Sequence, residues 1–227
     1  MEYEYYYNDL PGQGLTRNNL INTSLISKDK NVFVKWYYND TGYHQGKNQV
    51  IEPLLMDEKW ERELKYITKM ANFFPEHVPK ILDIDMKNRK IFLQVEGKDF
   101  WNLAEGQIPN YYKILPDWQD QMLDIIKAHK QLSLHKYSMH PSSYFIVSGK
   151  LKSINYFFTY SKFEKNISIS QVQSHIHVNR QEKIKKYLEF LNIDWNKSQP
   201  WSKMDMLCWH AFQDCYDKSF IDKALSV

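Results

Sequence analysis

The chain has 227 residues, of which 43% are hydrophobic and 15% aromatic, so it can bury a substantial core and does not have the composition of a disordered chain. Its 30 basic and 27 acidic residues give a net charge of +3 without a dense basic block, which argues against nucleic acid as a partner. The N-terminus is polar and acidic, and no apolar run approaches the ~18–20 residues that span a bilayer, so we expect a cytoplasmic protein that does not enter a membrane.

The first part of the chain is predicted to be rich in strands. Turn residues at 10–19, LPGQGLTRNN, separate two extended segments, of which LINTSLIS at 20–27 alternates well enough for a strand. A polar turn at 28–31 leads to VFVKWY at 32–37, a β-branched and aromatic run that contains one lysine. Together these segments predict an antiparallel meander.

A single long helix is predicted next, beginning at Asp57 with acids in its first turn and ending before Pro75. Its apolar residues recur at helical spacing on one face: Trp60, Leu64, Ile67 and Met70 or Ala71. Two further strands are predicted within 78–100, around a KNRK turn, and Gly97 ends the second of them.

The second half of the chain is predicted to be mostly helical. An amphipathic helix is expected at 118–135, and its apolar face comprises Met122, Ile125, Ile126, His129 and Leu132. A hairpin with a Gly-Lys turn follows in SMHPSSYFIVSGKLKSINYFF at 138–158. Further helices are predicted at 179–192 and 203–224.

The only two cysteines, Cys208 and Cys215, are expected to lie in the last of these helices. Two helical turns would separate them by roughly 10 Å along the axis, which is too far for a disulfide within one helix. We therefore expect two reduced thiols, as is usual in the cytoplasm.

The order of these elements resembles the protein-kinase-like superfamily, and within it the branch of choline kinases and aminoglycoside phosphotransferases. Each motif alone has low specificity, whereas the order and spacing of the motifs, which cover about residues 10–160, are more specific. The segments that carry the resemblance are GQGLTRNNLI at 12–21, VFVKWY at 32–37, WERELKYI at 60–67, VPKILDID at 78–85 and KIFLQVEGKDF at 90–100.

The resemblance implies an α+β fold with two lobes that form one kinase-like domain. Residues 1–97 would be the N-terminal, strand-rich lobe, with an antiparallel sheet and one long helix. Residues 98–227 would be the C-terminal lobe, mostly helical with a short β-hairpin.

The resemblance also assigns nucleotide-binding roles. Lys35 corresponds to the strand lysine that binds phosphates, and Glu63 to the helix acid that pairs with it, with Glu61 as the alternative if the register is off by half a turn. Gly12 and Gly14 would let backbone amides approach a phosphate. The cofactor that these roles imply is ATP.

The segment from Gln94 to Gly97, which includes Glu96, would contact an adenine through backbone groups if the resemblance holds. Simpler alternatives stay open for the whole set of predicted nucleotide contacts. The strand lysine would then be exposed, the helix acid solvated, and the two glycines part of a plain turn.

The residues that catalysis requires in this superfamily are absent from the hairpin region. Aligning FIV at 145–147 without a gap sets Met139 at the catalytic aspartate and Tyr144 at the metal-binding asparagine. Taking His140 as the motif histidine sets Ser142 at the aspartate instead. Neither register supplies a carboxylate.

The second metal-binding position is also changed. Asn155 stands where the magnesium-binding aspartate is expected, and its neutral carbonyl is a poor substitute for the hard anionic oxygen that Mg²⁺ prefers. No aspartate occurs between Asp124 and Asp194, and the first glutamate in that interval is Glu164. An active enzyme would need a relocated acid, for which Asp194, Glu164 and Asp205 are the candidates.

Other reactive residues give weaker indications. His175 and His177 have the spacing of one strand face, and His135 and His140 flank the loop, but zinc needs three or four convergent ligands. Ser142 and Ser143 beside His140 lack the glycines of a nucleophile elbow. We predict neither a metal site nor a hydrolase.

Three hypotheses follow from the sequence. The first is a catalytically inactive kinase-like protein, a pseudokinase, that acts as a binding or regulatory module and retains nucleotide binding. The second is an active ATP-dependent small-molecule phosphotransferase, or a nucleotidyl transferase, with relocated acids. The third is an interaction scaffold that binds no nucleotide. The partner would be an unidentified protein or a small molecule.

Overall fold

The computed structural model describes residues 2–6, 23–37, 53–136, 139–161 and 215–227. The chain divides into two compact units, of which the first contains residues 1–118 and 141–158 and the second contains residues 119–140 and 159–227. Each unit is described by itself. The predicted lobe boundary after residue 97 stays a prediction.

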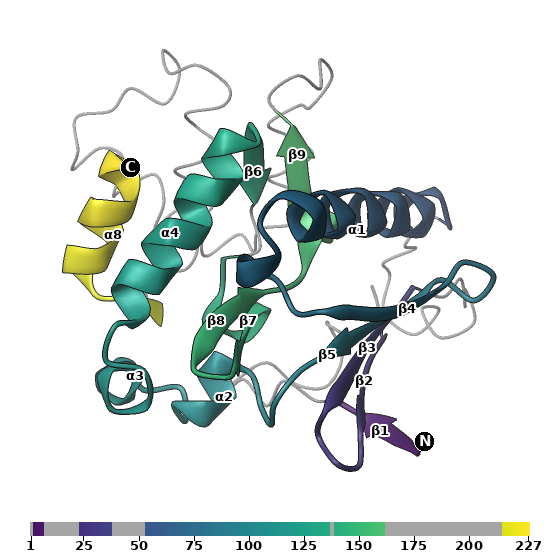
Figure 1. The fold of residues 1–227 in the computed structure, drawn as a ribbon, viewed down its shortest axis with the longest axis horizontal. Helices are drawn as coiled ribbons and strands as arrows, with labels where there is room; N and C mark the ends of the chain where they lie inside the picture. Colours follow the sequence, from purple (N-terminus) through teal and green to yellow (C-terminus); the bar gives the residue numbers. More distant parts are fainter. Residues whose placement is uncertain (1, 7–22, 38–52, 137–138, 162–214) are drawn as a thin grey trace, which may run out of the picture. The chain divides into compact units, whose positions relative to one another are not determined.

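The first unit is built on a five-stranded antiparallel sheet (Figure 1). Its strands are β1 (Tyr3–Tyr5), β2 (Thr23–Ser27), β3 (Val32–Trp36), β4 (Ile81–Asp85) and β5 (Lys90–Gln94). The strand order β1-β2-β3-β5-β4 places β3 in the centre. The predicted α+β class, the antiparallel meander and the later strand pair are confirmed.

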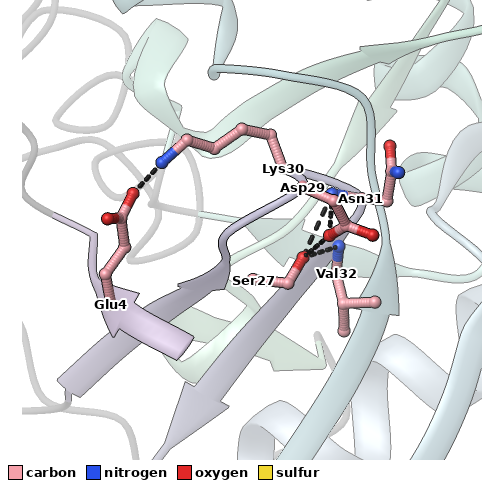
Figure 2. Close-up of polar contacts among 6 residues, drawn as sticks. All are labelled: Glu4, Ser27, Asp29, Lys30, Asn31 and Val32. Atoms are coloured by element: carbon pink, nitrogen blue, oxygen red, sulfur yellow. Dashed lines mark hydrogen bonds and ion pairs between the residues drawn. The ribbon is translucent and has the colours of Figure 1, made fainter. Parts of the chain in front are cut away.

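The polar turn between β2 and β3 is organised by the buried Ser27 (Figure 2). Its Oγ accepts hydrogen bonds from the N–H groups of Asn31, at 3.2 Å, and Val32, at 2.9 Å, and donates to Asp29 Oδ1 at 2.5 Å. One hydroxyl thus accepts from two backbone donors of the turn, and Asn31 N–H also donates to Asp29 Oδ1 at 3.3 Å.

Lys30, in the same turn, adopts the left-handed φ of 60°. Its ammonium forms an ion pair with Glu4 of β1, as Figure 2 shows, and its carbonyl accepts a hydrogen bond of 3.1 Å from the N–H of Gly97. The turn therefore connects the first strand of the sheet to the segment that leaves the sheet after β5.

Helix α1 (Pro53–Phe73) begins earlier than predicted and ends before Pro75 as predicted. Proline suits the first turn of a helix because its φ is already helical and its missing N–H is not needed there. The expectation of acids in the first turn is wrong, because that turn contains none and Asp57 lies further into the helix.

The buried face of α1 includes a carboxylate. Its buried residues recur every three or four positions: Lys59, Trp60, Glu63, Tyr66, Ile67 and Met70. Leu64 and Ala71, which the sequence assigned to this face, are half-buried, and Glu61 is exposed. Glu63 rather than Glu61 therefore points into the unit.

Two short helices, α2 (Phe100–Leu103) and α3 (Ile108–Ile114), follow the sheet and were not predicted. Both are too short to show a reliable helical period. They are held by aromatic packing: the rings of Phe100 and Tyr111 are 4.6 Å apart, and those of Tyr111 and Trp118 are 5.2 Å apart. The 3-10 turn η3 (Pro75–His77) precedes β4.

The predicted hairpin is confirmed as β7 (Tyr144–Val147) and β8 (Lys150–Ser153), and it belongs to the same unit as the sheet. Its turn residues are Ser148 and Gly149, with φ of 51° and 74°, rather than the predicted Gly-Lys pair. Positive φ at both central residues matches the twist of a two-residue hairpin. Short 3-10 turns, η4 (Pro141–Ser143) and η5 (Tyr156–Phe158), flank the hairpin.

Helix α4 (Trp118–Gln131), which belongs to the second unit from Gln119 onward, ends before the predicted residue 135. Ser133 has a left-handed φ of 57°, and β6 (Leu134–Lys136) then pairs with β9 (Thr159–Ser161). The pairing of β6 with β9, which is distant in sequence, therefore ends the helix although the apolar pattern of the sequence continues. Most of the predicted apolar face is buried, namely Met122, Ile125, Ile126 and His129.

Helix α8 (Lys218–Ser226) begins within the predicted segment 203–224. Asp217 has an extended ψ of 154° and caps the helix by accepting a 2.8 Å hydrogen bond from Phe220 N–H. The buried Cys215 therefore does not share this helix, so the predicted single helix from 203 to 224 is wrong.

Cys208 and the predicted helix at 179–192 lie outside the described residues. No helix within the described ranges is long and apolar enough to cross a membrane.

Candidate functional site

One face of β3 and its extension carries Phe33, Lys35 and Tyr37, because side chains alternate along a strand. All three are buried, and Lys35 is only 2% exposed. The ring of Phe33 packs on Phe145 of the hairpin at 5.1 Å, and the ring of Tyr37 packs on Trp60 of α1 at 5.9 Å. Lys35 is thus held between the hairpin side and the helix side of the unit.

Asn155 is the hydrogen-bond partner of Lys35. Lys35 Nζ donates to Asn155 Oδ1 at 2.5 Å, and Asn155 Nδ2 donates to Ser143 Oγ at 2.9 Å. Asn155 has a φ of 64°, a left-handed conformation that asparagine tolerates better than most residues. The bend after β8 therefore directs the carboxamide so that both of its ends are bonded.

Glu63 is fully buried and receives two donors at one oxygen. Its Oε2 accepts hydrogen bonds from Tyr37 Oη at 2.7 Å and from the Phe157 N–H at 2.8 Å. Its Oε1 has no hydrogen-bond partner among the described residues. Through Glu63, the helix α1 is joined both to the central strand and to the turn after the hairpin.

The ammonium of Lys35 lies in an aromatic and weakly solvated environment. Its Nζ is 5.2 Å from the centre of the Phe157 ring and 5.7 Å from that of Tyr37, distances at which a cation is attracted to a ring. Burial lowers the pKa of Lys35 to about 8, and the negative charge of Glu63 opposes this shift. Lys35 was predicted to pair with Glu63. No ion pair found among the described residues joins these two side chains, so Glu63 acts on Lys35 only through its nearby charge.

We call these six side chains the Lys35 cluster: Lys35, Tyr37, Glu63, Ser143, Asn155 and Phe157. The residues do not fit the Mg²⁺ that the resemblance implies, because Asn155 Oδ1 is bonded to Lys35 and Glu63 Oε2 already accepts two hydrogen bonds. Across the described ranges, no group of three or more His, Cys, Asp or Glu side chains could hold a metal ion.

The predicted adenine-binding segment uses most of its backbone donors within the chain. Gln94 N–H donates to the Lys80 carbonyl at 2.9 Å. The N–H groups of Val95 and Gly97 donate to carbonyls of the β2–β3 turn, at 2.9 Å and 3.1 Å. Glu96 is exposed and accepts hydrogen bonds from Ser148 N–H and Oγ at 3.0 and 3.1 Å. A bound base would have to compete with these contacts or use other groups.

The other predicted positions lie in the first unit, in the second unit or outside the described residues. Ser142 and Tyr144 are buried on either side of Ser143, which is the member of that loop that meets Asn155. Met139 belongs to the second unit, where its carbonyl accepts a 2.5 Å hydrogen bond from Tyr216 Oη. Several predicted positions lie outside the described residues: Gly12, Gly14, Glu164, His175, His177, Asp194 and Asp205.

The sequence did not identify Tyr37, Ser143 and Phe157 as members of the cluster. Alternation along the strand was a usable signal for Tyr37, which lies two positions after Lys35 and so shares its face. The contacts of Ser143 and Phe157 depend on the left-handed bend at Asn155 and on the packing of η5 against α1, for which the sequence carries no local signal.

A second buried polar contact joins Tyr6 to Asp99. The Tyr6 hydroxyl donates to Asp99 Oδ2 and accepts a 2.8 Å hydrogen bond from Asp99 N–H, while Asp99 Oδ1 caps α2 by accepting from Asn102 N–H at 3.0 Å. Burial is the main cause that raises the pKa of Asp99 to about 6, and the hydrogen bonds from Tyr6 and Asn102 oppose it. This contact fixes the end of β1 to the segment that leaves the sheet.

No protein-family profile and no curated protein matches the chain.

Proposed function

We propose that the protein is a catalytically inactive, kinase-like binding or regulatory module in which the Lys35 cluster is a degenerate nucleotide site. The observation that carries this proposal is the 2.5 Å hydrogen bond from Lys35 Nζ to Asn155 Oδ1. In the resembled family, the position of Lys35 holds a phosphate-binding lysine and the position of Asn155 holds a metal-binding aspartate. A neutral amide at that position supplies no charge for a metal ion and is itself bonded to the lysine.

The buried acid of α1 supports the same proposal. Glu63 accepts hydrogen bonds from Tyr37 and from the backbone of Phe157, so it connects the strand, the helix and the turn after the hairpin. A buried carboxylate with these partners stabilises the arrangement of the three elements, whereas phosphoryl transfer depends on charge placed around the transferred group. The retained residues therefore favour binding and architecture over chemistry.

The experiment that tests inactivity is a transfer assay with ATP, Mg²⁺ or Mn²⁺ and a panel of small hydroxyl compounds. We expect no product above that of the Lys35→Met variant, whose fold is checked by circular dichroism. Turnover that depends on Lys35 would overturn the proposal and would favour a phosphotransferase with relocated acids.

The scaffold hypothesis is favoured by a separate observation, which is the burial of Lys35 together with the engaged backbone donors of Gln94, Val95 and Gly97. A thermal-shift titration with nucleotides separates the two binding hypotheses. A ligand at 100 times its dissociation constant stabilises a protein by about 2.7 kcal/mol. No shift with any nucleotide would leave the scaffold as the function.

A further inference from the structure

Residues 2–6, which contain β1, dock along the edge of β2 through their backbone. β1 pairs with β2 in antiparallel orientation, and the order of the five strands places β1 at one edge of the sheet. The ladder continues at both ends, since Lys28 N–H donates to the Glu2 carbonyl at 3.1 Å and Tyr6 N–H donates to the Ser24 carbonyl at 2.8 Å. Main-chain contacts of this kind fit any extended segment, so the specificity of docking comes from side chains.

Every second side chain of this segment meets a matched partner. Glu2 forms an ion pair with Lys28, and Glu4 forms one with Lys30, which Figure 2 shows. Both lysines belong to the turn after β2. Tyr6 lies two positions further along the same face, because side chains alternate along an extended segment. The edge of β2 therefore recognises an acid, a second acid two positions later and a tyrosine two positions after that.

Tyr6 is the anchor of the segment. Its ring is 5.2 Å from that of Phe33 on β3 and 6.0 Å from that of Phe145 in the hairpin. Its hydroxyl donates to the fully buried carboxylate of Asp99 and accepts a 2.8 Å hydrogen bond from the Asp99 N–H. A phenylalanine would make the ring contacts but neither hydrogen bond, so this position selects a tyrosine.

The charged contacts of the segment hold it only weakly. β1 has three residues, and the four side chains of the two ion pairs are between 44% and 74% exposed, where an ion pair contributes little to stability. Docking within one chain has a single advantage over docking between chains, which is that the connection keeps the segment near its own edge. That connection, residues 7–22, has 16 residues and can extend to about 50 Å, far enough to reach another molecule.

We propose that the edge of β2 is an interface between two copies of this chain, in which residues 2–6 of each copy dock on β2 of the other. A second copy carries the same acids and the same tyrosine, so it forms every contact described above without any new recognition. The exchange is reciprocal, so the assembly closes as a symmetric dimer. The proposal does not depend on the Lys35 cluster and goes beyond the proposed function.

Two charge-reversed variants of the full chain test the exchange. The segment variant, Glu2→Lys/Glu4→Lys, and the edge variant, Lys28→Glu/Lys30→Glu, each bring like charges together within one chain. In a mixture of the two, opposite charges meet only when each segment docks on the other variant. Native mass spectrometry of an equimolar mixture, with one variant isotope-labelled, should show at least tenfold more heterodimer than homodimer of either variant. No heterodimer between variants that are both folded by circular dichroism would overturn the proposal.

Two controls make the mixture specific. Lys80→Glu/Lys87→Glu reverses two exposed lysines elsewhere and has the same net charge as the edge variant. It should form no heterodimer with the segment variant, and pairing between these two would show that net charge alone drives association. Adding Tyr6→Ala to both charge-reversed variants should reduce the heterodimer at least tenfold. An unchanged heterodimer would show that the segment does not dock on the partner, which overturns the proposal.

The wild-type chain gives a second measurement that requires no substitution. Because the connection favours docking within one chain, its effective concentration sets the range in which exchange appears, which is near millimolar for a flexible connection. Light scattering on a concentration series into that range should show the mass rising from one copy toward two. A mass of one copy throughout, or a mass above two copies, would overturn the reciprocal exchange.

Discussion

Lys35 and Asn155 lie 120 positions apart in the chain and meet through a single 2.5 Å hydrogen bond. The bond joins the central strand of the sheet to Asn155, which lies two residues after the end of the hairpin at Ser153. Since both residues are in the same compact unit, the contact belongs to the interior of that unit. Its donor is a buried ammonium, so the state of the cluster depends on pH.

The first prediction concerns the pH dependence of stability. The pKa of Lys35 is about 8 in the folded protein against 10.5 for an ordinary lysine, so the unfolded chain binds more protons between these values. Stability therefore rises with pH through this window, and the penalty for burying the charge is fully present below pH 8. From pH 7.5 to 9.5, the free energy of unfolding should rise by about 2 kcal/mol through Lys35.

Urea denaturation of the wild type and Lys35→Met at both pH values measures this contribution. The difference between the two proteins isolates Lys35 from other groups that titrate in the same range. An identical rise in the variant would show that another group is responsible. Measurements should stop at pH 9.5, because burial raises the pKa of Tyr6 and Tyr156 and reverses the slope at higher pH.

The second prediction compares two glutamates of α1. Glu63→Gln should lower the free energy of unfolding by about 1–3 kcal/mol, because it disturbs a buried acceptor of two hydrogen bonds. Without the carboxylate charge, the pKa of Lys35 should also move further down. Glu61→Gln, on the exposed side of the same helix, should change stability by less than about 0.5 kcal/mol.

Chemical denaturation at pH 7 measures both variants. Equal losses in the two would indicate that helix propensity rather than the buried contacts of Glu63 determines the result. A loss in Glu63→Gln without any movement of the Lys35 titration would separate the packing role of Glu63 from its electrostatic role.

The strands and the long helix of the first unit could be predicted because their signals are local. The alternation of VFVKWY and its β-branched residues predict β3, and the spacing of Trp60, Ile67 and Met70 predicts the buried face of α1. Glu63 falls between these apolar positions, so its burial follows from the helical period, although the sequence alone left Glu61 open.

The contacts of the cluster could not be predicted in the same way. Asn155 was identified as a replacement for an acid, but its bonds to Lys35 and Ser143 arise from a left-handed bend and from residues distant in sequence. The early end of α4 has a similar cause, since Leu134–Lys136 is drawn into pairing with Thr159–Ser161. Such tertiary pairings are not encoded in the period of a single segment.

The third prediction uses two glycines with nearly the same φ. Gly97 and Gly106 have φ of 67° and 66°, but a Cβ on Gly97 would meet nothing within 4 Å, whereas one on Gly106 would lie 3.1 Å from the Trp101 ring. Gly97→Ala should therefore cost about 1–2 kcal/mol, from the left-handed conformation alone. Gly106→Ala should cost more, because the buried indole must also shift. Thermal denaturation compares the two, and equal losses would show that Trp101 adjusts freely.

The fourth prediction concerns Tyr6 and Asp99. The pKa of Asp99 is about 6 in the folded protein and 3.8 for an ordinary aspartate, so between these values the folded state binds more protons and stability falls as pH rises. From pH 4 to 6.5, this fall should amount to about 2 kcal/mol, and Asp99→Asn should abolish it while keeping a cap for α2.

Tyr6→Phe should cost about 1–3 kcal/mol, because it leaves the Asp99 N–H and carboxylate without the hydroxyl. A double-mutant cycle at pH 7 measures the coupling, and additive losses in the double variant would mean that the two residues do not stabilise each other.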